Sequence, residues 1–178
     1  ILAEYGLADV SMRRVATSLS VAPGALYWHI ANKQELIASM AEEIVQELLC
    51  GPLPEPARLS GELREALLST RDGAEVVVAA VSQPGSQVQK ELETRFAASV
   101  RAWLGEAAST SDVRIAARGL LRLTLGDAAV QQAAAQLAQA TGADEESDGA
   151  DEHAAAVAFL LDGLKRSASA GTKLWPHE

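Results

Sequence analysis

Apolar residues recur every three or four positions along most of this chain, which is the spacing of one face of an α-helix. The clearest example covers 33–49, where the apolar positions are Leu36, Ile37, Met40, Ile44, Val45 and Leu48. Further helices are predicted over 59–69, 74–81, 86–104, 112–140 and 154–168. Asp112 is the expected cap of the fourth of these, and the acidic, glycine-containing stretch 141–152 is an expected loop. Because strand-forming runs of Val, Ile and Tyr are scarce, we expect an all-α protein.

Two short helices precede residue 33. The first is predicted to begin after Ser11, a suitable N-cap, and to run to about Leu19 with Met12, Val15 and Leu19 on one apolar face. The second begins at Pro23, in the first turn where proline is tolerated, and runs to about Ile30. The few residues between them predict a very tight connection.

Composition narrows the class of protein. The chain has 178 residues, 48% of them hydrophobic, and a formal net charge of −9. No uninterrupted apolar stretch is long enough to cross a membrane, and the single cysteine, Cys50, fits a reducing cytoplasm. The first residue is Ile1 rather than Met, so we expect a truncated start. The acidic charge predicts weak non-specific affinity for nucleic acid.

Two short helices joined by a tight turn suit DNA recognition, because one can cross the backbone while the other enters the major groove. On the second helix, Leu26 and Ile30 are expected to face inward, which leaves Tyr27, Trp28 and His29 outside. Their polar atoms can donate to phosphates while the rings pack on sugars or thymine methyl groups. The alternative is that Tyr27 and Trp28 close the core of a small helical unit.

The residues of this region resemble the TetR family of transcriptional regulators. The resemblance rests on Gly6 and Leu7, on 11–16, on 21–30, and on Asn32, Lys33 and Leu36 at the family's spacing, and it covers about 1–48. It implies a helix-turn-helix three-helix unit over 1–46 and a helical ligand-binding and dimerisation domain over 47–178. It further implies a homodimeric repressor without cofactor that binds a palindromic operator and is released by a small-molecule effector.

The resemblance also implies the residues that contact DNA. Ser11 and Lys33 would bind phosphate, and Arg13 would reach a base edge. The full set is Ser11, Arg13, Arg14, Pro23, Gly24, Ala25, Tyr27, Trp28, His29 and Lys33. Pro23 departs from a base-reading glutamine in the tetracycline-responsive branch of the family, so the operator sequence is expected to differ.

A fainter similarity to the same branch covers 67–74 and 124–127. Positions that would bind a magnesium-chelated drug there are apolar in this chain, which indicates no metal and a largely apolar effector. The expected pocket residues are Leu59, Leu63, Val77, Ala80, Phe96 and Trp103. Arg95, Arg118 and Arg122 would meet polar ends of the effector or form salt bridges.

The dimer is expected to form a four-helix bundle from the helices 112–140 and 151–168 and their two-fold mates. The small and aliphatic residues expected at the contact are Ala116, Ala117, Leu120, Ala128, Ala155, Phe159, Leu160 and Gly163.

Two alternative functions stand beside this one. An enzyme is disfavoured because His29, His153 and His177 are scattered without metal-ligand spacing, and Asp151 to His153 reads as a solvated helix start. Cys50 has no histidine near it in sequence, so it is read as an idle thiol rather than a nucleophile. The second alternative is a helix-turn-helix regulator without a small-molecule effector. The sequence specifies neither the effector nor the operator.

Overall fold

The computed structural model describes residues 1–105, 108–143 and 149–170. All regular secondary structure in these ranges is helical, so the predicted all-α class is confirmed. The α-helices are α1 (Leu2–Tyr5), α2 (Met12–Ser18), α3 (Pro23–Tyr27), α4 (Lys33–Cys50), α5 (Pro56–Ser69), α6 (Gly73–Val81), α7 (Gln87–Leu104), α8 (Thr110–Thr141) and α9 (Ala150–Ala170), with a 3₁₀ turn, η1, at Leu7–Asp9.

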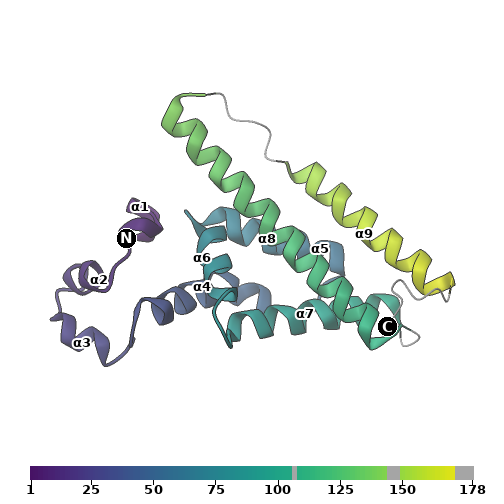
Figure 1. Ribbon diagram of the computed structural model, residues 1–178, viewed down its shortest axis with the longest axis horizontal. Coiled ribbons are helices and arrows are strands. Elements are labelled where there is room, and N and C mark those ends of the chain that lie inside the picture. The colour runs from purple at the N-terminus through teal and green to yellow at the C-terminus, as the bar shows by residue number, and fades with distance from the viewer. Residues whose placement is uncertain (106–107, 144–148, 171–178) are drawn as a thin grey trace.

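The short helices α1, α2 and α3 form a small unit at one side of the molecule, and α4 runs from this unit into the body (Figure 1). The long helix α8 crosses the body and contacts α5, α6, α7 and α9. Helix α9 returns beside α8 in the opposite direction (Figure 1). Because α8 contacts four other helices, a shift of α8 relative to them would disturb most of the core.

The core lies between α5, α6, α7 and α8. Leu63 of α5, Val77 of α6, Phe96 of α7 and Ala128 of α8 each have 0% of their surface exposed. Close packing reaches the backbone at Gly73, where an added Cβ would lie 2.4 Å from the Leu67 carbonyl oxygen. This contact explains why the α5–α6 turn carries glycine at that position.

The caps of the helices follow the predicted chemistry with one correction. The Ser11 hydroxyl accepts the Arg14 backbone N–H at 3.3 Å, as expected of an N-cap. Asp112 does not cap α8, because the helix begins one turn earlier. Ser109 is the N-cap, and its hydroxyl accepts the Asp112 N–H at 3.0 Å and donates to the Asp112 carboxylate at 2.7 Å.

Some boundaries and faces differ from the sequence prediction. Helix α3 ends at Tyr27 rather than near Ile30, and α9 begins at Ala150 rather than 154. Leu19 is 60% exposed because the chain turns at the end of α2, and Ala16 occupies the buried position instead. The centre of the predicted loop, 144–148, lies outside the described residues.

No helix within the described part of the chain is long and apolar enough to cross a membrane.

Candidate nucleic-acid interface

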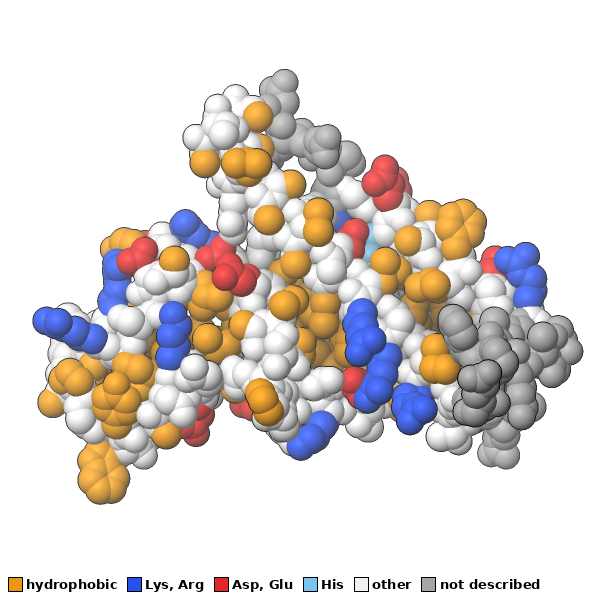
Figure 2. All heavy atoms as spheres, viewed as in Figure 1, with side chains coloured by type: hydrophobic (Ala, Val, Ile, Leu, Met, Phe, Trp, Pro, Cys, Tyr) orange, Lys and Arg blue, Asp and Glu red, His pale blue; other side chains and the backbone are white. Residues whose placement is uncertain are grey.

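Helix α3 presents nearly all of its side chains to solvent. Pro23 occupies its first turn, and Leu26 is its one buried residue. Tyr27 is 52% and Trp28 90% exposed, which contradicts the alternative that these rings close a core. Hydrophobic side chains accordingly protrude from the region of α3 in the space-filling view (Figure 2). A short helix with exposed aromatic rings suits contact with a second molecule.

The connection between α2 and α3 is as tight as predicted. Ser20 has a φ of 56°, in the left-handed region that non-glycine residues rarely adopt. The next residue, Val21, donates its backbone N–H to the Ala16 carbonyl at 3.0 Å. These features reverse the chain within a few residues and bring α2 against α3, which are in direct contact.

The basic residues of this unit differ in how they are engaged. The Arg13 and Lys33 side chains are exposed and have no ion pair within the described chain. By contrast, the Arg14 guanidinium bonds the Asp9 carboxylate and lies 4.1 Å from the centre of the Tyr5 ring. Arg13 and Lys33 are therefore available to an anion, whereas Arg14 already ties α2 to the preceding segment.

The remaining predicted contact residues are also exposed to solvent. Ser11, Pro23, Gly24, Ala25 and His29 are all exposed. No atom outside the local chain lies within 4 Å of a Cβ built on Gly24. The start of α3 is therefore an open surface that the backbone of a partner can approach closely.

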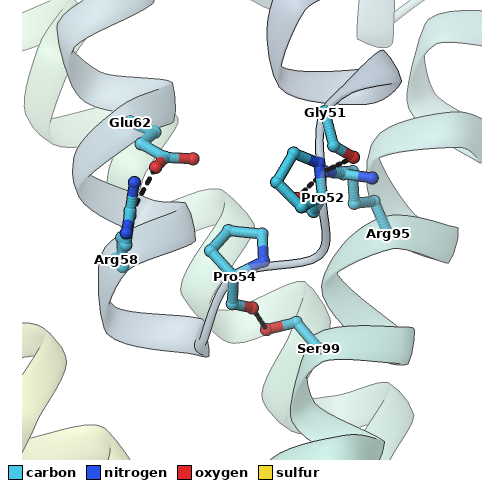
Figure 3. Close-up of polar contacts among 7 residues, drawn as sticks. All are labelled: Gly51, Pro52, Pro54, Arg58, Glu62, Arg95 and Ser99. Atoms are coloured by element: carbon cyan, nitrogen blue, oxygen red, sulfur yellow. Dashed lines mark hydrogen bonds and ion pairs between the residues drawn. The ribbon is translucent and has the colours of Figure 1, made fainter.

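Helix α4 connects this unit to the body, and a residue of α7 fixes its far end. The Arg95 guanidinium donates to the carbonyls of Leu49 at 3.2 Å, Gly51 at 2.8 Å and Pro52 at 2.6 Å, as Figure 3 shows for the last two. Carbonyls at a helix C-terminus carry partial negative charge, which a guanidinium neutralises. Arg95, predicted either to meet an effector or to form a salt bridge, therefore bonds helix-end carbonyls instead.

The predicted effector pocket lies in the packed core. Its members Leu59, Leu63, Val77, Ala80 and Phe96 are 0% exposed, and Trp103 is partly buried beneath the Lys165 ammonium, 4.2 Å from the ring centre. A groove of about 1250 Å³ lies elsewhere, lined by residues of α2, α4 and α5, and none of these six residues lines it.

Arg118 is already paired. Its guanidinium bonds the Glu93 carboxylate at 2.9 and 3.1 Å. Burial raises the pKa of Glu93, but hydrogen bonds from Arg118 and Gln89 outweigh it, so that the pKa lies below its ordinary value. The salt-bridge alternative for Arg118 is therefore confirmed.

His153 is buried rather than solvated, which corrects the prediction for 151–153. It is 4% exposed, because it faces α5 and α8 while Asp151 and Glu152 face solvent. Its Nδ1 lies 3.4 Å from the Asp127 oxygen that accepts the Arg64 Nε–H at 2.9 Å. Burial lowers the pKa of His153, Asp127 opposes this shift, and Arg64 adds to it. The described residues contain no group of three or more His, Cys, Asp or Glu side chains that could bind a metal ion.

Part of the predicted dimer contact is wrong. Ala117 and Leu120 are each 1% exposed and Ala128 is 0% exposed, because this face of α8 packs on other helices of the same chain. On α9, however, Phe159 is 75% and Leu160 48% exposed, and α8 exposes Ile115, Val130 and Leu137. The apolar residues that remain exposed on these two helices, together with Ala155 and Gly163, form a surface that we call the α8–α9 face.

Comparison with known proteins places the chain among bacterial regulators. The family described as "Bacterial regulatory proteins, tetR family" matches residues 1–40. The class G tetracycline repressor of Vibrio anguillarum is 34% identical over 84 residues, which are 43% of this chain and 40% of that protein. The matched region thus spans less than half the length of this curated relative.

Solved structures resemble the chain over nearly its whole length. BioQ of Mycobacterium smegmatis is 36% identical with a TM-score of 0.80, covering 93% of this chain and 92% of that one. BioQ bound to its double-stranded DNA operator is 35% identical with a TM-score of 0.75, covering 93% and 91%. A TetR variant of Acinetobacter baumannii AYE in complex with minocycline is 28% identical with a TM-score of 0.76, covering 99% and 93%.

Proposed function

The chain belongs to the tetR family of bacterial regulatory proteins, and we propose that it is a homodimeric repressor that a small, largely apolar molecule releases from a palindromic DNA operator. The observation that carries this proposal is α3, which buries Leu26 and exposes its remaining side chains together with Trp28. The DNA-binding unit would comprise 1–46, and the effector-binding and dimerisation domain would comprise 47–178.

In this proposal α3 enters the major groove. Its first residues, Pro23, Gly24 and Ala25, carry no polar side-chain atoms, so they approach bases through shape and apolar contact with thymine methyl groups. Arg13 supplies the hydrogen bonds that distinguish a base edge, whereas Lys33 binds phosphate at the N-terminus of α4. Tyr27, Trp28 and His29 contact the sugar–phosphate backbone.

The net charge of −9 shapes the affinity. Non-specific binding depends on the number of phosphates that Lys and Arg neutralise, and the unit exposes few such residues. We expect weak binding to random duplexes and a large ratio of specific to non-specific affinity. BioQ, which resembles this chain over its length, has been solved with its DNA operator, and this supports the same use of the fold here.

The α8–α9 face supports a homodimer. Phe159 at 75% and Val130 at 72% exposure are large apolar side chains that a second copy would cover. A two-fold dimer places two recognition helices on the two halves of a palindrome. A stable interface of this kind buries more than about 1,000 Å² in total.

Release by an effector is the second part of the proposal. The TetR neighbour was solved with minocycline, a small molecule, and supports a ligand site within this fold. The predicted site here is apolar and fully packed, so a ligand at Leu63, Val77 and Phe96 has to separate α5, α6 and α7. That dense packing also favours the second candidate function, a regulator of the same fold without a small-molecule effector.

One experiment tests both parts. The chain is used to select duplexes from a random-sequence pool, and apolar compounds that stabilise the chain are found by thermal shift. The affinity of the chain for the selected duplex is then measured with and without each stabilising compound. We expect the selected duplex to be palindromic. A stabilising compound should weaken the binding of the chain to this duplex, and the duplex should weaken the binding of the compound by the same factor. Selection without a palindrome would contradict the dimeric repressor. A compound that binds without changing duplex affinity would favour the effector-free regulator.

A further inference from the structure

The DNA-binding unit meets the body at a second place besides α4, namely the turn 70–74 between α5 and α6. Asp72 lies at the centre of this turn and is 8% exposed. Its φ of 56° is a left-handed conformation that is costly for a residue with a Cβ. A buried carboxylate in such a conformation needs hydrogen bonds that offset its cost. The donors of these hydrogen bonds come from two separate parts of the molecule.

One oxygen of Asp72 bonds the DNA-binding unit. Its Oδ2 accepts the backbone N–H of Leu7 at 2.6 Å, a buried hydrogen bond between residues 65 positions apart. The preceding residue, Gly6, has a φ of 83°, and a Cβ added there would lie 2.7 Å from the same oxygen. The positive φ favours glycine at this position, and the absence of a Cβ leaves room for the carboxylate. Beside this bond, the Arg71 guanidinium donates to the Glu4 carbonyl at 2.9 Å.

The other oxygen of Asp72 bonds α8. Its Oδ1 accepts a hydrogen bond from the Gln136 side-chain amide. One helical turn earlier, the Gln132 amide nitrogen donates to the Thr70 carbonyl at 2.9 Å, and its oxygen accepts the Ala74 N–H at 3.0 Å. The two glutamines therefore bind the 70–74 turn to the helix that carries part of the α8–α9 face.

We infer that Asp72 is a positioning residue that links α8 to the DNA-binding unit and sets the spacing of the two recognition helices in the dimer. We call the hydrogen bonds from Gln136 through Asp72 to Leu7 the bridge. The claim about spacing rests on the proposed function, because it needs a dimer and an operator, whereas the bridge does not. A displacement of α8 moves Gln136, and a bonded carboxylate transmits that displacement to Leu7 at the start of the unit. This connection is separate from α4, whose far end Arg95 fixes.

The bridge is tested first without DNA, by hydrogen exchange in the intact chain. Asp72→Gly removes the carboxylate while glycine adopts the left-handed φ without strain, so the turn keeps its path. The Leu7 amide should exchange about tenfold faster or more, because its buried acceptor is gone. The Val21 amide, bonded to the Ala16 carbonyl, serves as an internal reference that should not change.

Two further variants separate the bridge from its surroundings. Gln136→Ala removes only the hydrogen bond from α8 to the Asp72 carboxylate. Because Asp72 is then held less firmly, the Leu7 amide should also exchange faster. Glu75→Gln is the matched control, because it removes a negative charge from an exposed position in the first turn of α6. Leu7 exchange at the wild-type rate in both Asp72→Gly and Gln136→Ala would overturn the inference.

The spacing is then measured on duplexes. The palindrome selected by the wild-type chain is compared with versions carrying one base pair inserted or removed at the centre. Asp72→Gly and Gln136→Ala should narrow the affinity ratio between native and altered spacing by about fivefold or more, with an unchanged preference within each half-site. Glu75→Gln should retain the wild-type ratio.

The outcomes distinguish this inference from the proposed function. If the wild-type chain selects no palindrome, the proposed function fails and the claim on spacing fails with it, while faster Leu7 exchange in Gln136→Ala still establishes the link from α8. If a palindrome is selected and exchange rises but the spacing ratio stays at the wild-type value, Asp72 is a structural bond only and the positioning role is wrong.

Discussion

Arg13 and Lys33 are both exposed cations, yet they should affect DNA binding differently. Lys33→Ala removes a phosphate contact, which carries no base information, so affinity should fall on all duplexes and the salt slope should decrease by about 1. Arg13→Ala should cost about 1–3 kcal/mol on the selected duplex and relax the preference at one base pair per half-site. Binding titrations over a range of salt concentrations measure both effects. Equal losses on selected and random duplexes for both variants would contradict the assignment of Arg13 to a base.

A second prediction at the scale of residues concerns pH. Burial lowers the pKa of His153 below its ordinary value of 6.5, although Asp127 opposes this shift. The unfolded chain therefore binds a proton more readily than the folded chain. The free energy of unfolding should therefore be unaffected by the protonation of His153 above pH 6.5. It should fall as the pH drops from 6.5 through the pKa of the folded state, by at most about 1.4 kcal/mol per pH unit.

Denaturant unfolding between pH 7.5 and 5 measures this contribution as the difference between wild type and His153→Gln. His29→Gln is the matched control, because it makes the same substitution at an exposed histidine. A His153→Gln profile parallel to that of the wild type would show that His153 does not titrate differently on folding.

The chemistry of single residues was only partly predictable from the sequence. The exposure of Tyr27 and Trp28 follows from their spacing relative to Leu26, which is a local property. The burial of His153 and the two-sided bonding of Asp72 depend on partners more than 20 positions away, at Asp127, Leu7 and Gln136. The apolar periodicity of a helix does not indicate which distant residues will contact it. The gap between the predicted helices 59–69 and 74–81 is the one signal that pointed to the 70–74 turn.

At the scale of elements, α4 is held at its end by a single guanidinium. Arg95→Met should lower the free energy of unfolding by about 1.5–3 kcal/mol, because it leaves the α4 carbonyls without their charged donor. Arg58→Met is the matched control, and Figure 3 shows Arg58 together with Arg95. Arg58 forms an exposed pair with Glu62 at 2.7 Å, and removing it should change stability by no more than about 0.5 kcal/mol.

Chemical denaturation of the two variants at neutral pH provides the comparison. Similar, small losses for both would mean that the helix-end carbonyls are satisfied by water when Arg95 is absent. A large loss of stability in Arg58→Met alone would show that the Arg58–Glu62 pair, and not Arg95, stabilises this region.

The elements themselves were largely predictable because apolar periodicity and capping residues are local signals. The start of α2 after Ser11 matches the prediction, and α4 ends at Cys50, one residue beyond the predicted 33–49. Helix α9 begins four residues before the predicted 154 because the face of His153 is covered by α5 and α8, and that packing extends the helix beyond its apolar pattern.

At the scale of the whole molecule, the sequence did not predict which face of α8 packs in the core of its own chain. Helix α8 has small or apolar residues on more than one side, so composition did not distinguish the side that packs in the core from the side left exposed. Ala117 and Ala128 face the core, whereas Val130 and Leu137 are 72% and 66% exposed. Only the three-dimensional arrangement of α5 to α9 separates these two sets.

The last prediction tests whether the α8–α9 face forms the dimer. Phe159→Glu places a charge on a residue that is 75% exposed in one chain, so the fold of the single chain should be unaffected. Light scattering at micromolar concentration should show a dimer for the wild type and a monomer for this variant, because the charge would be buried without a partner. Leu53→Glu is the control, since Leu53 is also apolar and 45% exposed but lies in the connection between α4 and α5.

The same variant should separate specific from non-specific binding. In a dimer the second recognition helix binds its half-site at a high effective concentration, so losing the dimer should weaken binding to the selected palindrome by about 10²–10⁴-fold. Binding to random duplexes should change far less, because it depends on the exposed cations of each unit, which Phe159→Glu leaves in place. A Phe159→Glu protein that remains dimeric would exclude the α8–α9 face as the interface. A monomer that binds the palindrome as tightly as the wild type would instead show that one recognition helix is sufficient.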